Sequence, residues 1–167
     1  PRAERVLLAA AAAGFAVFMA LFPFGLMNKR YIGRVVQRFA ADGSHPVALR
    51  EGLTETVLVM RRDLLGSPVE YRLVTNGFSM SGTGMMSDRY MKLFVYWPVA
   101  LKPRTESALL ISYGAGTTAR ALSDTAGLRS IDVVDISREI LGTAPVLFPP
   151  PGRTPLQDPR VRVHVED

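Results

Sequence analysis

Two glycines and an aspartate have the residue types and the spacing of a nucleotide-binding site. Gly114 and Gly116 follow the apolar run ALLIS, and a helical pattern starts directly after them. Glycines at a turn from strand to helix let backbone N–H groups approach a ligand closely. Asp135 ends the next apolar run, 19 residues after Gly116, where a carboxylate can accept hydrogen bonds from ribose hydroxyls. The pattern predicts a nucleoside site built from Gly114, Ala115, Gly116 and Asp135.

Two other interpretations of these residues stay open. The segment YGAGTTA also fits G-x-G-x-x-A, a variant of the dinucleotide fingerprint, so an NAD-dependent oxidoreductase is one alternative. That fingerprint usually opens a domain, whereas here a β-rich stretch and a helix precede it, which counts against NAD. The other alternative is an ordinary turn followed by a solvated acid.

The elements that position these residues alternate between strand and helix. The runs ALLIS, SIDVVD and VRVHV have the composition of buried strands, and helix starts follow the first two of them. This alternation is typical of a parallel α/β sheet. The chain contains only the first half of such a sheet, so we expect a partial Rossmann-like domain at residues 105–167.

The residues before this domain predict a small β-rich unit and a helix. Thr54–Met60 and Glu70–Thr75 are expected to be paired strands joined by RRDLLGSP, and Asn76-Gly77 is a strong turn signal. The stretch FSMSGTGMMSD is expected to be a loop, and Arg89–Leu101 a helix broken near Pro98. We therefore assign residues 53–104 to this unit and residues 31–52 to a linker.

The N-terminal residues predict a membrane-spanning helix. Val6–Met27 is a run of 22 residues without a charge. As a helix it would be about 33 Å long, enough to cross a hydrocarbon core of ~30 Å. We assign residues 1–30 to a transmembrane helix and its basic flank. The chain begins at Pro1 and ends at Asp167 after a strand-like run, as expected of a fragment or a processed chain.

Basic residues follow the apolar run, with no acid before Asp42. They are Lys29, Arg30, Arg34 and Arg38. By the positive-inside tendency, this flank predicts that the C-terminal domain lies on the cytoplasmic side of the membrane. Residues 31–39 are either a short amphipathic helix on the membrane surface or a solvated linker.

Composition excludes several classes of site. The net charge is +5, but the basic residues are spread along the chain without an aromatic and basic platform, so we expect no nucleic-acid partner. The chain has no cysteine and two histidines. Disulfides and cysteine nucleophiles are thus excluded, and we expect no metal site.

Segments in order along the chain resemble the spermidine synthase (polyamine aminopropyltransferase) family, most closely its membrane-fused branch. They are EGLTETVLV, NGFSMSGT, RYMKLFVYWPVAL, LLISYGAGTTARAL, IDVVDIS and DPRVRVHVED. The resemblance implies a small β unit joined to a Rossmann-like domain of the S-adenosylmethionine methyltransferase type. It implies S-adenosylmethionine or its decarboxylated form as the donor, no metal, and the option of a homodimer.

The resemblance also assigns roles to single residues. Gly114 and Gly116 match the family's glycine turn, and Asp135 takes the place of the glutamate that holds the ribose. Asp167 matches the acid on the adenine side. Tyr90 and Thr83 match positions on the substrate side.

The sequence departs from the family's pattern at positions that contact the amine substrate in the family. Ala115 replaces an aspartate, Ala121 replaces a glutamate, and Lys92 replaces the glutamate of the Y-x-E motif. Buried ammonium groups need anions close by, so these changes predict altered or lost polyamine use. The family's catalytic aspartate would lie beyond Asp167, so we name no catalytic residue in this chain. A non-catalytic membrane-attached sensor or interaction domain is the alternative to a transferase.

Overall fold

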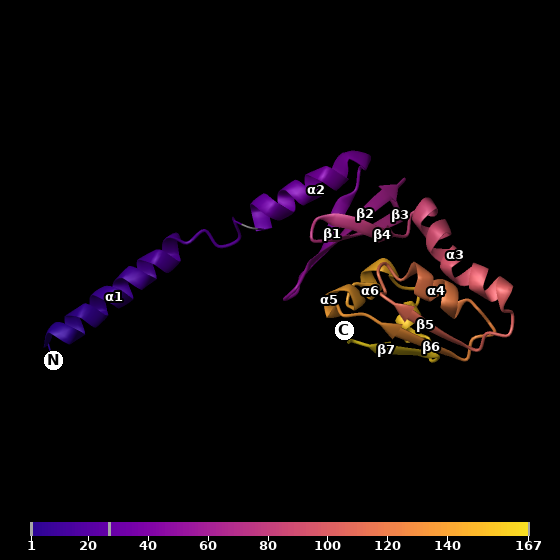
Figure 1. Cartoon of the computed structure of the whole chain (residues 1–167). Coiled ribbons are helices and arrows are strands. Elements are labelled where there is room, and N and C mark those ends of the chain that lie inside the picture. The colour runs from indigo at the N-terminus through magenta and orange to yellow at the C-terminus, as the bar shows by residue number, and fades with distance from the viewer. Residues whose placement is uncertain (1, 27, 167) are drawn as a thin grey trace. The chain divides into compact units, whose positions relative to one another are not determined.

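The computed structural model describes residues 2–26 and 28–166, and these fall into two compact units, 1–35 and 36–167. The first unit contains helix α1 (Arg2–Leu21) and a π-helical turn (Asn28–Ile32) (Figure 1). The helical segment Ala3–Leu21 is long and apolar enough to cross a membrane, judged by its length and composition alone. A helix is therefore present in the expected region, but it ends at Leu21, Met27 lies outside the described residues, and its crossing of a membrane stays a prediction. Helix α2 (Gly33–Phe39) continues from the π-helical turn.

The second unit begins with an antiparallel sheet. Its strands are β1 (His45–Glu51), β2 (Thr56–Leu64), β3 (Ser67–Thr75) and β4 (Phe78–Gly82), paired in chain order. Helix α3 (Met85–Leu101) follows the sheet.

A parallel sheet completes the second unit. Its strands are β5 (Ser107–Ile111), β6 (Ser130–Val134) and β7 (Val161–His164), in that spatial order. Helix α4 (Thr117–Ser123) joins β5 to β6. The short helices α5 (Arg138–Leu141) and α6 (Ala144–Leu147) lie between β6 and β7, with a 3₁₀ turn at Pro155–Gln157. The mixed α/β class expected from the sequence is confirmed.

Four local expectations need correction. Residues 45–51 were expected in a linker, yet they form β1, an edge strand with a register shift after Pro46, where a proline is tolerated. The connection RRDLLGSP is mostly strand, since β2 and β3 are joined by Leu65-Gly66 alone, with φ of 51° and 79°. Helix α3 runs through Pro98 to Leu101 and is not broken there, although Pro98 has no N–H to donate to the carbonyl of Phe94.

The stretch FSMSGTGMMSD also differs from the expected loop, since it contains β4 and the start of α3. The Asn76-Gly77 turn is confirmed, with φ of 50° and 84° as a type I′ hairpin requires.

Two apolar clusters hold the second unit together. One packs α3 and α4 on the parallel sheet through Val95, Leu122, Ile131 and Val133. The other joins the antiparallel sheet to the turn after β5 and to the end of α6, and it includes Val59, Leu73, Ala115 and Phe148. The antiparallel sheet is therefore fixed next to the turn that follows β5.

Candidate functional site

The turn between β5 and α4 has a strained backbone that glycine accommodates. Ser112, Gly114 and Gly116 have φ of 71°, 56° and 77°, in the left-handed region. A Cβ on Gly116 would lie 2.5 Å from Tyr113 Oη and 2.8 Å from Phe148 Cε2. Only glycine fits there without a shift of its neighbours. Strain of this kind is frequent where the backbone approaches a ligand.

Asp135 lies directly after β6 and joins two turns. Its side chain is 5 % exposed. Oδ2 accepts a hydrogen bond from Tyr113 N–H at 2.7 Å, and Oδ1 accepts one from Ser137 N–H at 2.8 Å. A carboxylate offers about four lone-pair positions, so these two bonds leave it further acceptor capacity. The structure thus brings the predicted glycine turn and the predicted acid into direct contact.

Glu55 and Ser137 are site neighbours that the sequence analysis did not single out. Ser137 caps α5, since its Oγ accepts from Ile140 N–H at 3.0 Å, and the same hydroxyl donates a short hydrogen bond to Glu55 Oε1. The serine before REIL was visible as a helix-cap signal. Glu55 lies in the loop between β1 and β2, so no local pattern connects it with the turn.

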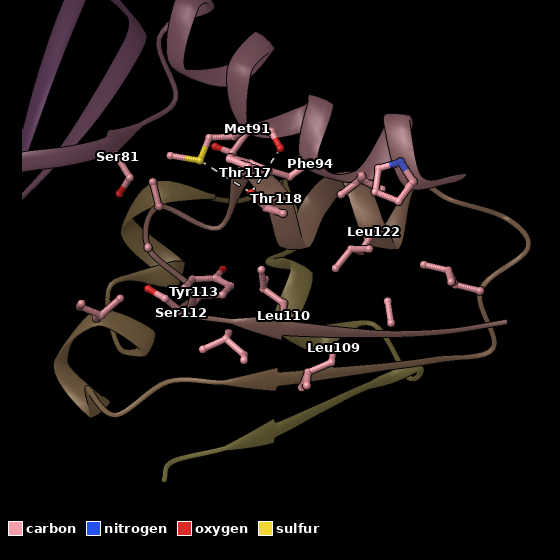
Figure 2. A pocket seen from close by; sticks show the side chains of 18 of the residues that line it. Ser81, Met91, Phe94, Leu109, Leu110, Ser112, Tyr113, Thr117, Thr118 and Leu122 are labelled. Carbon is pink, nitrogen blue, oxygen red and sulfur yellow. Dashed lines mark hydrogen bonds between the residues drawn. The ribbon is translucent and has the colours of Figure 1, made fainter. Parts of the chain in front are cut away.

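A cavity of about 800 Å³ opens beside the glycine turn and runs between α3 and β5. Gly114 and Ala115 line it, while Asp135 does not. Figure 2 shows Ser81, Ser112 and Thr118 at the turn end and Leu109 and Leu110 along β5. Thr118 Oγ1 donates to the Met91 carbonyl at 3.4 Å, which ties α4 to α3.

The residues predicted on the substrate side lie apart from that cavity. Thr83 lines a second, smaller cavity, where its Oγ1 accepts from Tyr71 N–H at 2.9 Å. Tyr90 is 59 % exposed and packs edge-on against Phe94, with ring centroids 5.0 Å apart. Asp167 lies outside the described residues. Their assigned roles therefore stay predictions.

The structure shows what surrounds the residues that depart from the family pattern. Lys92 Nζ lies 2.6 Å from Asp88 Oδ2, and this hydrogen bond raises the pKa of the lysine. Next to Ala121, Arg120 is not one of these departures, and its guanidinium lies over the Phe148 ring, 5.6 Å from the ring centroid. Ala121 is fully buried in the apolar core. Within residues 2–26 and 28–166, no group of three His, Cys, Asp or Glu side chains could hold a metal ion.

Sequence comparison relates the chain to named enzymes, although no family model matches it. It is 28% identical over 94 residues to the polyamine aminopropyltransferase of Alkaliphilus oremlandii, a match that covers 54% of this chain and 33% of that enzyme. It is 30% identical over 94 residues to the enzyme of the same name from Clostridium beijerinckii, with the same coverage. The chain spans about one third of the length of these relatives.

Solved structures with the same fold include two spermidine synthases. The enzyme from Thermotoga maritima gives a TM-score of 0.61 at 15% identity, covering 73% of this chain and 41% of that one. A spermidine synthase in complex with the transition-state analogue AdoDATO also gives 0.61 at 15% identity, covering 72% and 39%. The resemblance to the spermidine synthase family is confirmed, and its membrane-fused branch stays a prediction.

Proposed function

We propose that this chain, a relative of the spermidine synthase family, carries the nucleoside-binding half of a membrane-attached transferase that uses S-adenosylmethionine or its decarboxylated form. One observation carries the proposal. The strained glycine turn after β5 and the acid after β6 are joined by the bond from Tyr113 N–H to Asp135. Backbone amides and a strand-end carboxylate are thereby placed side by side, as recognition of a ribose requires.

Among the family's properties, polyamine binding has the least support from the residues of this chain. Lys92 stands where the family has a glutamate, and it forms an ion pair with Asp88. Ala115 and Ala121 provide no charge in place of two further acids. A lysine and two methyl groups, that of Ala121 fully buried in the core, therefore stand where the resemblance places three carboxylates. This favours a transferase with an altered acceptor, or a domain that binds the nucleoside as a sensor without turnover.

Membrane attachment through α1 is the second element of the proposal. It is supported by the 19-residue apolar stretch Ala3–Leu21 and by the basic residues that follow it. The excess of lysine and arginine on that flank favours a cytoplasmic position for the second unit.

Calorimetric titration of the full chain in detergent micelles tests the nucleoside site. The ligands are methylthioadenosine, S-adenosylmethionine, its decarboxylated form and NAD. We expect the adenosyl thioethers to bind and Asp135→Asn to weaken them at least tenfold. Asp132→Asn is the matched control, because Asp132 lies on β6, the strand that Asp135 directly follows, and its Oδ1 lies 2.8 Å from His164 Nε2 instead of at the turn.

The titration separates the alternatives. Binding of NAD but of no thioether would replace the proposal with the oxidoreductase interpretation. An Asp132→Asn effect as large as that of Asp135→Asn would show that the loss reflects general damage. If no nucleoside binds at all, only the hypothesis of an interaction domain remains.

A further inference from the structure

The loop between β1 and β2 lies against helix α5 and the residues that start it. Glu55 contacts the N-terminal end of α5, because its Oε1 accepts the hydrogen bond from Ser137 Oγ. Gly52 lies beside Glu139 of the same helix, where a Cβ on the glycine would be 2.7 Å from the Glu139 Cδ atom. A loop of the antiparallel sheet therefore contacts the segment that directly follows Asp135.

We propose that Glu55 is a positioning residue of the nucleoside site, which fixes the loop after β6 through Ser137 and does not itself touch the ligand. The inference rests on the proposed function, in which Asp135 meets the ribose. The affinity for the nucleoside then depends on a residue that lies outside the parallel sheet.

Ser137 is the residue through which Glu55 acts on Asp135. Its hydroxyl carries one proton, which is directed at Glu55 Oε1, and the same oxygen accepts from Ile140 N–H at 3.0 Å. Its backbone N–H donates to Asp135 Oδ1 at 2.8 Å. Ser137 is 3 % exposed, so a hydroxyl that lost Glu55 would be buried without its acceptor. Loss of Glu55 should therefore loosen the backbone that supports Asp135.

The Glu55 carboxylate is itself held on both oxygens. Thr54 Oγ1 donates to Oε2 at 2.8 Å, while Oε1 accepts from Ser137. A hydrogen bond from a hydroxyl to a carboxylate is stronger than one between neutral groups. A glutamine at position 55 could still accept from Ser137 through its amide oxygen, whereas an alanine could not. Glutamine thus keeps the contact and alanine removes it.

Calorimetric titration of methylthioadenosine into the full chain in detergent micelles tests the inference. We expect Glu55→Ala to weaken binding at least fivefold and Glu55→Gln to change it less than twofold. Glu51→Ala is the matched control, because Glu51 ends β1 and its exposed side chain makes no hydrogen bond or ion pair within the described residues. If Glu55→Ala does not fold, Glu55→Asp replaces it, because the aspartate is one methylene too short to reach Ser137.

A double-mutant cycle with Ser137→Ala separates positioning from direct contact. If Glu55 acts only through the Ser137 hydroxyl, Glu55→Ala should weaken binding no further in the Ser137→Ala background. Hydrogen exchange of the amides of residues 136–140, measured without ligand, reports on the loop itself. Glu55→Ala should speed this exchange at least threefold, and Glu51→Ala should leave it unchanged.

The outcomes distinguish the inference from the proposed function. Additive losses in the cycle would place Glu55 on the ligand itself and overturn the inference. Unchanged binding or unchanged exchange in Glu55→Ala would also overturn it, while the proposed function would stand. A wild-type chain that binds no adenosyl thioether would refute the proposed function, and the positioning role with it.

Discussion

Replacement of Gly116 by alanine should destabilise the second unit more than the same change at Gly114. Both residues have positive φ, 77° and 56°, so alanine at either position costs about 1–2 kcal/mol of backbone strain. They differ in the space that a methyl group would meet. At Gly116 the new Cβ would lie 2.5 Å from Tyr113 Oη and 2.8 Å from Phe148 Cε2. At Gly114 the nearest atom is Ser81 Oγ at 3.1 Å, on a side chain that can rotate away.

The overlap at Gly116 adds the cost of overpacking a core, about 1–3 kcal/mol. We therefore expect Gly116→Ala to lower the free energy of unfolding by about 2–5 kcal/mol. Gly114→Ala should lower it by about 1–2 kcal/mol. Urea denaturation of the full chain in micelles, followed by circular dichroism, measures both values.

A double-mutant cycle with Tyr113→Phe tests the cause. The Tyr113 hydroxyl is buried and has no hydrogen-bond partner within the part of the chain that the structure describes, and burial raises its pKa. Its removal should therefore leave stability unchanged or higher. In the Tyr113→Phe background, Gly116→Ala should cost about 1 kcal/mol less, because one of the overlapping atoms is gone. Equal costs at the two glycines, or strict additivity in the cycle, would refute the reasoning.

Two further predictions concern stability away from the turn. Hydrogen bonds from Arg160 lower the pKa of Asp158 from its usual 3.8 to about 2, so this carboxylate stabilises the fold above pH 4 and its contribution is lost as pH falls through 2. Asp158→Asn should cost about 1 kcal/mol at neutral pH after allowance for solvent screening, and its acid unfolding curve should be flatter than that of the wild type between pH 4 and 2. Thr83→Val should cost about 1–3 kcal/mol in urea denaturation, because it leaves Tyr71 N–H without its acceptor, while Thr83→Ser should cost less than 1 kcal/mol. A stable Thr83→Val variant with impaired ligand binding would instead favour the substrate role of this residue.

The sequence predicted the parallel sheet and its turn well because their signals are local. A buried apolar strand, a glycine turn and a strand-end acid each lie within a few residues, and the contact between the Gly114 turn and Asp135 follows from parallel pairing. The same local reasoning predicted the Asn76-Gly77 hairpin, because both residues accept positive φ.

The features that were missed depend on tertiary contacts. Leu65 has φ of 51°, which a leucine adopts only because the β2–β3 pairing enforces the hairpin. Strand β1 contains a proline and ends in two charged residues, and its pairing with β2 outweighs that weak strand pattern. Glu55 reaches Ser137 from the loop between β1 and β2, and no spacing rule relates residues so far apart in the chain.

The bonds that Asp135 accepts from Tyr113 and Ser137 have a consequence for how tightly a ligand could be held. They bind the loop after β5 and the loop after β6 to one carboxylate, so neither loop can change conformation without disturbing the other. A ligand that reaches one loop therefore meets both in their final arrangement. Little conformational entropy remains to be lost on association, and affinity then depends on the contacts themselves.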